Sequence, residues 1–125
     1  MLEGSKAVAT IAVSDLDRAK TFYGETLGLP MHDERAGGVL YETGGTSFLV
    51  YPSQFAGTSQ STLMSFDVED FDQTMKEMRE AGVTFEEYDF PGLKTVEGVA
   101  EIEGVRSAWF KDPDGNILAL GQRES

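Results

Sequence analysis

Val13-Ser14-Asp15-Leu16-Asp17 and Val68-Glu69-Asp70-Phe71-Asp72 are two copies of one short pattern, and they lie 55 residues apart. Each copy follows an apolar run that is typical of a strand, and each begins a segment whose apolar residues recur at helical spacing. The two segments then reach a glycine, Gly28 in the first and Gly82 in the second, where a helix commonly ends. The pattern therefore predicts one strand–helix unit that occurs twice.

The first half of the chain continues this unit with further strands. Ser14 is the expected N-cap of the helix, and Asp15 and Asp17 place negative charge in its first turn, where free N–H groups favour it. Residues 39–41 and 47–51 are strand-like runs separated by a glycine turn. The first half therefore predicts the order β-α-β-β-β.

The second half shows the same order after a polar linker, residues 52–61. Residues 107–110 and 117–120 are strand-like and flank Asp112-Pro113-Asp114-Gly115-Asn116, a strong signal for a hairpin turn. We therefore expect a single domain over residues 1–125, with module 1 over about 6–52 and module 2 over about 62–121. The predicted class is α+β, with two tandem β-α-β-β-β modules whose curved sheets enclose a cavity between their bare faces.

Composition limits the function. The chain has no cysteine, which excludes disulfides and thiolate chemistry, and it has no apolar run long enough for a membrane helix. We expect a cytoplasmic protein without a membrane partner. The net charge of −12 disfavours nucleic acid as a partner.

Acidic residues are concentrated in one stretch. They serve solubility in one interpretation, and in another they create a field that attracts cationic small molecules. Nine acids lie in this stretch: Asp67, Glu69, Asp70, Asp72, Glu77, Glu80, Glu86, Glu87 and Asp89.

The order and spacing of these motifs resemble the vicinal oxygen chelate superfamily, which includes glyoxalase I, extradiol dioxygenases and bleomycin-resistance proteins. The resemblance runs from about residue 7 to residue 121 and implies the paired-module fold with its cavity. Its matched residues are mostly architectural and do not specify chemistry. They are Val13-Ser14-Asp15-Leu16-Asp17, Phe22-Tyr23, Leu27-Gly28-Leu29, Val68-Glu69-Asp70, Ala81-Gly82-Val83 and Trp109-Phe110-Lys111-Asp112-Pro113-Asp114-Gly115-Asn116.

The resemblance also implies four strand positions where the metalloenzymes of the superfamily carry His, Gln or Glu. In this chain they correspond to Val8, about Phe48, Leu63 and Ala119, none of which can replace the water around a divalent ion. A shift of one residue restores no ligand, because the neighbours are Ala7, Ala9, Ser47, Leu49, Thr62, Met64, Leu118 and Leu120. We therefore expect no metal and no other cofactor.

Strand alternation predicts which side chains face the cavity. Trp109 or Phe110 joins this set, and we select Trp109. A mostly apolar cavity is typical of a small-molecule site, although a well-filled core has the same composition. The predicted pocket residues are Val8, Thr10, Ala12, Phe48, Val50, Leu63, Ser65, Asp67, Trp109, Ile117 and Ala119.

Few other residues suggest chemistry, and no catalytic residue is assigned. Asp67, at the end of its strand, could pair with a cationic ligand, act as a general base, or be a rim carboxylate. His32 is the only histidine, and alternation prevents it from converging with Asp33 and Glu34. We interpret it as a surface residue. Tyr41, Tyr51 and Tyr88 are candidate hydrogen-bond donors at a pocket mouth.

The sequence therefore favours a metal-independent small-molecule-binding protein of the glyoxalase/bleomycin-resistance type, sequestering a cationic or apolar ligand. The alternative is a related enzyme, a lyase, isomerase or dioxygenase relative, with atypical or no metal ligands. A third interpretation is a domain with a filled cavity that acts through protein contacts. The resemblance also implies a homodimer.

Overall fold

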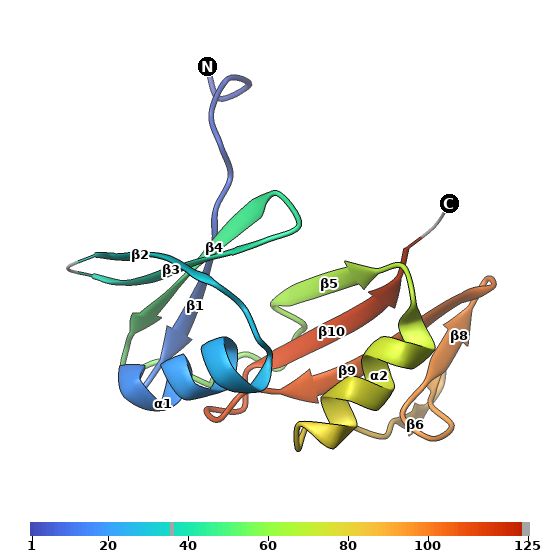
Figure 1. The fold of residues 1–125 in the computed structure, drawn as a ribbon. Coiled ribbons are helices and arrows are strands. Elements are labelled where there is room, and N and C mark those ends of the chain that lie inside the picture. Colours follow the sequence, from blue (N-terminus) through green and yellow to red (C-terminus); the bar gives the residue numbers. More distant parts are fainter. Residues whose placement is uncertain (36, 124–125) are drawn as a thin grey trace. The chain divides into compact units, whose positions relative to one another are not determined.

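The computed structural model describes residues 1–35 and 37–123. The chain divides into two compact units, Met1–Ala56 and the residues from Gly57 onward, and each contains one predicted module. The division falls within the polar linker. Figure 1 follows the chain through both units.

The first unit is a four-stranded sheet with one helical segment. Its strands have the order β1-β4-β3-β2, with β1 and β4 parallel and the other pairs antiparallel. Its elements are β1 (Ala9–Val13), α1 (Leu16–Lys20), η1 (Thr21–Thr26), β2 (Met31–Arg35), β3 (Gly38–Thr43) and β4 (Thr46–Pro52).

The second unit has the same topology, with strand order β5-β10-β9-β8 and a parallel pair of β5 and β10. The short strands β6 and β7 pair with each other in the connection that precedes β8. The predicted duplication and the α+β class are therefore confirmed (Figure 1). The elements are β5 (Met64–Val68), α2 (Phe71–Glu80), β6 (Asp89–Phe90), β7 (Leu93–Lys94), β8 (Ala100–Ile102), β9 (Val105–Lys111) and β10 (Ile117–Gln122).

The first helix begins one residue later than predicted. Asp15 is its N-cap, and its side chain accepts a hydrogen bond from the backbone N–H of Arg18 at 3.1 Å. The prediction of Ser14 as the cap is wrong, because the Ser14 hydroxyl instead accepts a hydrogen bond from the Arg18 guanidinium at 3.0 Å. Asp70 caps α2 in the same way as Asp15 caps α1.

Both helical segments end as the glycines predict. Gly28 and Gly82 have φ of 72° and 96°, which an L side chain rarely adopts. The first segment is not a regular α-helix throughout, because α1 continues into the π-helical η1. The Leu27 N–H donates to the Phe22 carbonyl at 2.9 Å, which is an i→i+5 contact.

An aromatic cluster joins η1 to the first sheet. The Tyr23 ring lies 6.0 Å from the Tyr41 ring and 5.7 Å from the Phe48 ring, measured between centroids. All three side chains are buried. Phe48 is therefore part of the core between the sheet and its helix.

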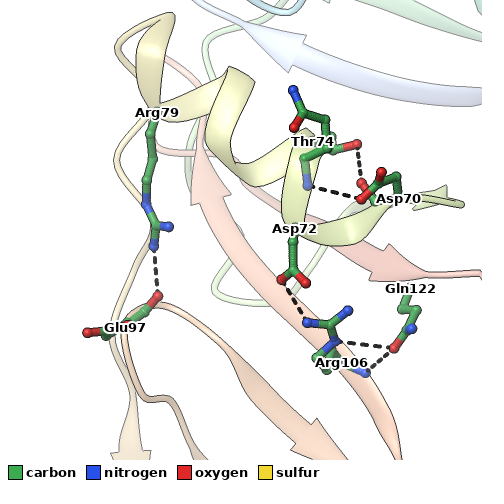
Figure 2. Close-up of polar contacts among 8 residues, drawn as sticks. Asp70, Asp72, Thr74, Arg79, Glu97, Arg106 and Gln122 are labelled. Carbon is green, nitrogen blue, oxygen red and sulfur yellow. Dashed lines mark hydrogen bonds and ion pairs between the residues drawn. The ribbon is translucent and has the colours of Figure 1, made fainter.

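In the second unit, α2 is held to the sheet by apolar and polar contacts. Phe71 and Met75 are buried, and the Arg106 guanidinium lies over the Phe71 ring at 5.0 Å. Arg106 also donates to Asp72 at 2.7 Å and to Gln122, as Figure 2 shows. At the other end of α2, Arg79 donates to the Glu97 carbonyl at 2.7 Å. These contacts fix which face of the sheet the helix covers.

The predicted hairpin turn between β9 and β10 is confirmed. The Asp112 carboxylate accepts hydrogen bonds from the backbone N–H groups of Asp114 and Asn116. The Asn116 amide donates to Asp112 at 2.8 Å and accepts from the Gly57 N–H at 3.2 Å. The turn therefore holds the beginning of the second unit against its sheet.

Candidate functional site

The candidate site is the face of the β5–β10–β9 sheet opposite α2, called the open face below. Strand register defines it: Ala119 lies opposite Ser65 and Trp109, and Gly121 lies opposite Asp67 and Ser107. Their neighbours Leu118 and Leu120 are buried and belong to the other face. The module 2 residues predicted for the pocket share the open face; they are Leu63, Ser65, Asp67, Trp109, Ile117 and Ala119. Their role in binding a ligand stays a prediction.

Two oxygen atoms converge over Gly121. A methyl group on the Cα of Gly121 would lie 3.0 Å from Asp67 Oδ1 and 3.6 Å from Ser65 Oγ. The glycine therefore leaves space into which the Asp67 carboxylate leans, toward the middle of the sheet. Sequence reasoning missed Gly121 and Ser107, although each lies two residues from a predicted pocket residue and alternation could have found both.

Trp109 extends across the open face. It belongs to β9, yet its indole N–H donates to the Thr62 hydroxyl beside β5 at 3.2 Å. The indole thus reaches over the middle strand β10, where Ala119 is small. The Tyr88 ring contacts Trp109 at a centroid distance of 5.6 Å, and the Phe90 ring contacts Tyr88 at 5.8 Å. These three rings form the aromatic cluster of the site.

Two of the tyrosines considered from the sequence have different surroundings. Burial raises the pKa of Tyr88, and its phenol, protonated at neutral pH like that of any tyrosine, can donate a hydrogen bond. Tyr41 is not at a pocket mouth, because it is buried in the aromatic cluster under η1, where burial also raises its pKa. Tyr51 lies on the face of the first sheet opposite the helix.

Most of the acidic stretch has local structural roles. The carboxylates of Asp67, Glu80 and Asp89 make no hydrogen bond or ion pair to any described residue, and of these three Asp67 lies on the open face. The hydroxyls of Ser65 and Ser107 also have no such contact to a described residue. Arg123 lies beside Asp67 but donates to its backbone carbonyl. The engaged acids are Glu69 with Arg123 at 3.0 Å, Asp70 as the helix cap, Asp72 with Arg106, Glu77 with Gln73, Glu86 with Lys111 at 3.5 Å, and Glu87 with Thr95 and Gly98.

In the first unit, part of the predicted pocket lining is wrong. Phe48 and Val50 lie opposite Ala9 and Ile11 and share the face that packs on the helix, with exposed fractions of 2% and 0%. The physical reason is parity: β4 is offset by one residue from the prediction, so Ser47, Leu49 and Tyr51 occupy the other face.

Two other module 1 residues lie on the face that alternation predicted, and Val8 lies outside the strand. Thr10 and Ala12 lie opposite Leu49 and Tyr51 of β4, on the face away from the helix. Val8 is exposed and precedes β1 by one residue.

The corrected register adds no metal ligand. Moving the third position from Phe48 to Ser47 or Leu49 introduces neither imidazole nor carboxylate. Within neither unit do the described residues bring together three His, Cys, Asp or Glu side chains that could hold a metal ion. The expectation that this protein needs no metal stays a prediction.

His32 has a surface environment. Its Nδ1 lies 3.3 Å from the Glu42 carboxylate, and both side chains are about half exposed. Glu34, which the sequence placed near it, instead pairs with Lys20. The arrangement supplies no converging set of catalytic groups.

The helices α1 and α2 are short, with 5 and 10 residues. Across residues 1–35 and 37–123, no helix is long and apolar enough to cross a bilayer.

Two matching β-α-β-β-β units and a sheet face that carries the candidate site define the class of this protein. The chain belongs to the Glyoxalase/Bleomycin resistance protein/Dioxygenase superfamily, whose family model matches residues 7–120. None of the curated proteins matches it.

Solved structures share the fold at low sequence identity. A glyoxalase family protein from Enterococcus faecalis is 20% identical, with a TM-score of 0.74 over 97% of this chain and 99% of that one. Lactoylglutathione lyase from Agrobacterium tumefaciens is 19% identical, with a TM-score of 0.70 over 94% and 93%. A glyoxalase/bleomycin resistance protein from Streptomyces sp. CB03234 is 26% identical, with a TM-score of 0.67 over 94% and 100%.

Proposed function

We propose that this protein is a metal-independent binding protein for small cationic molecules with an apolar part, and that the open face of the second unit holds the ligand. The observation that carries the proposal is the Asp67 carboxylate, which has no partner among the described residues and lies on the same face as Trp109. A carboxylate favours a cation, and an aromatic face attracts one by about 0.5–2 kcal/mol.

The charge of the whole chain supports a cationic ligand. The net charge of −12 produces a field that raises the local concentration of cations and their association rate. Because Asp70, Asp72 and Glu69 are engaged in capping or ion pairs, Asp67 is the acid of this strand end that remains available to a ligand. Binding should therefore weaken as salt increases.

The chain provides its own reporter for this test. Trp109 is the only tryptophan, so intrinsic indole fluorescence comes from the open face. We would titrate the protein with small aromatic amines and follow fluorescence together with the thermal unfolding temperature, which rises when a ligand binds the native state. A cation should change both signals, and a neutral analogue should change neither.

Two charge-neutralising variants separate a local from a general effect. Asp67→Asn should weaken cation binding by about tenfold, which is about 1.4 kcal/mol. Glu80→Gln removes the same charge from the exposed end of α2 and should leave the affinity nearly unchanged. Equal affinities of wild type and Asp67→Asn would refute the role given to Asp67.

Metal analysis of the purified protein discriminates this proposal from the enzyme alternative. We expect no stoichiometric divalent ion, and ligand binding should survive treatment with a chelator. One tightly bound divalent ion per chain would contradict metal independence and favour a metalloenzyme.

A homodimer and a cytoplasmic location belong to the same proposal. The absence of cysteine is consistent with a reducing compartment, where disulfides do not stabilise proteins. Sedimentation of the purified protein tests the dimer, and a monomer at micromolar concentration would refute it.

A further inference from the structure

We propose that the ligand carries a primary ammonium group, which Asp67, Ser65 and Ser107 bind over Gly121, and an aromatic tail that lies toward Trp109. This inference rests on the proposed function and adds the chemistry of the head group. It commits to one occupant, a small arylalkylamine.

Two hydrogen-bond acceptors from β5 come close together above Gly121. Asp67 Oδ1 and Ser65 Oγ both approach the position that a side chain at Gly121 would fill, at 3.0 and 3.6 Å. Neither atom makes a hydrogen bond to a described residue. Two oxygens that lie close together above one glycine suit a donor with more than one N–H group, placed above them on the open side of the sheet.

The Ser107 hydroxyl of β9 is a third acceptor near Gly121. Ser107 lies opposite Gly121, as Asp67 does on the other side, so the three residues form one row across the sheet. Adjacent strands lie about 4.8 Å apart. Since the Asp67 carboxylate already reaches the middle strand, one nitrogen with two hydrogen bonds of about 2.9 Å can span the remaining gap to Ser107.

The number of acceptors around Gly121 equals the number of N–H donors on a primary ammonium group. A primary ammonium has three N–H donors and no acceptor. The residues around Gly121 offer one carboxylate and one hydroxyl in the row of Asp67 and Ser107, and a second hydroxyl from Ser65 in the next row. A quaternary ammonium carries the same charge but has no N–H group, so it would leave the hydroxyls without a donor. Hydrogen bonds to a charged group are stronger than those between neutral groups, so the two cations should be clearly discriminated.

The position of Trp109 indicates where the aromatic tail of the ligand lies. Trp109 and Ala119 are one row further along the sheet, about 7 Å from Asp67 and Gly121 along the strands. A spacer of two or three carbons between nitrogen and aromatic ring covers this distance. The ring would then contact the indole, which the Thr62 hydrogen bond and the Tyr88 contact hold in place.

The test uses three probes of nearly equal size: 2-phenylethylamine, its N,N,N-trimethyl analogue and 2-phenylethanol. Trp109 fluorescence should show that the primary amine binds at least tenfold more tightly than the trimethyl compound, and that the alcohol does not bind measurably. Equal binding of the two cations would overturn the ammonium inference and leave the proposed function intact. Binding of neither cation would overturn both.

Variants test whether the two hydroxyls cause the preference for a primary amine. The double variant Ser65→Ala/Ser107→Ala should lose most of its affinity for the primary amine and keep its affinity for the trimethyl analogue. Thr84→Ala, which removes an exposed hydroxyl elsewhere in the unit, should change neither. A double variant that retains the full preference for the primary amine would overturn the inference.

Gly121→Ala provides an independent check that does not remove a polar group. Its new methyl group would occupy the position at which the two oxygens converge and displace the carboxylate. Both cations should bind at least fivefold more weakly, with the thermal unfolding temperature retained as evidence of folding. Unchanged affinity in the folded variant would show that the ammonium does not lie over Gly121.

Discussion

Asp15 and Asp70 lie 55 residues apart in the sequence and make the same contact. Each carboxylate accepts a hydrogen bond from the backbone N–H three residues further on, at 3.1 Å in both helices. Each also follows the strand that pairs in parallel with the last strand of its unit. The duplication therefore extends from strand order to individual hydrogen bonds.

Equivalent substitutions at these caps should have equivalent effects. Asp15→Ala and Asp70→Ala should each lower the free energy of unfolding by about 1 kcal/mol, because each leaves a helical N–H without its acceptor. Denaturant titration measures the loss. Ser14→Ala is the control and should cost less than Asp15→Ala, since the helical N–H of Arg18 donates to Asp15 and the Ser14 hydroxyl accepts from the exposed Arg18 guanidinium. A larger loss at Ser14 would restore it as the cap.

The fold could be predicted because its signals are local. The Asp112–Asn116 turn, the glycines Gly28 and Gly82 and the helical spacing of Phe71 and Met75 each act through neighbours in sequence. The exact cap could not be predicted, since Ser14 and Asp15 are both residue types that cap helices well. The π-helical η1 has no signal of its own in the sequence. The aromatic packing of Tyr23 is likewise a property of the folded unit.

The side chains of β4 alternate between the helix-packed face, which holds Phe48, and the other face, which holds Leu49. Phe48→His should lower the free energy of unfolding by about 2–4 kcal/mol, because it removes a ring from a buried cluster and buries a polar imidazole. Leu49→His, one residue on, should cost less than about 1 kcal/mol, since Leu49 is only partly buried on the other face. Equal losses at the two positions would contradict the register.

The buried amide of Asn116 should be among the more sensitive positions outside the apolar core. Asn116→Ala leaves the Gly57 N–H and one Asp112 oxygen without this partner, so we expect a loss of about 2 kcal/mol. Thermal and denaturant unfolding measure it. Pro113→Ala, in the exposed part of the same turn, serves as the control and should stay within about 0.5 kcal/mol of wild type. Comparable losses in the two variants would argue against the network.

The hydrogen bonds to Glu87 should make the stability of the folded protein depend on pH. The Thr95 hydroxyl and then the Gly98 N–H, both at 2.7 Å, hold the pKa of Glu87 below its ordinary value of 4.5. A pKa lowered by folding stabilises the protein above the unfolded value, and this stabilisation is lost as the pH falls through the folded value. The stability difference between wild type and Glu87→Gln should therefore be largest at neutral pH and shrink below pH 4.5.

Unfolding midpoints in urea across an acid series measure this difference. Glu80→Gln, whose carboxylate has no such contacts, is the control and should show a difference that changes little with pH. A Glu87→Gln difference that grows in acid would reverse the sign and refute the argument.

The candidate site could be predicted in part. In the second unit, alternation from Asp67 to Leu63 and from Ala119 to Ile117 gave one face, because the parallel pair of β5 and β10 has no irregularity. The convergence over Gly121 could not be read from the sequence, since it depends on how the Asp67 side chain leans. The same limit applies to Trp109, whose indole crosses the middle strand β10 to reach Thr62.

The central claim is that an organic cation binds at the row formed by Asp67, Gly121 and Ser107. Amide chemical shifts in ¹⁵N-labelled protein, recorded during titration with 2-phenylethylamine, test it most directly. We predict that the largest shifts occur at these three residues and at Trp109, and that Asp67→Asn raises the ligand concentration at their midpoint by about tenfold. Saturating shifts elsewhere in the chain, or no shifts at millimolar ligand, would contradict the account.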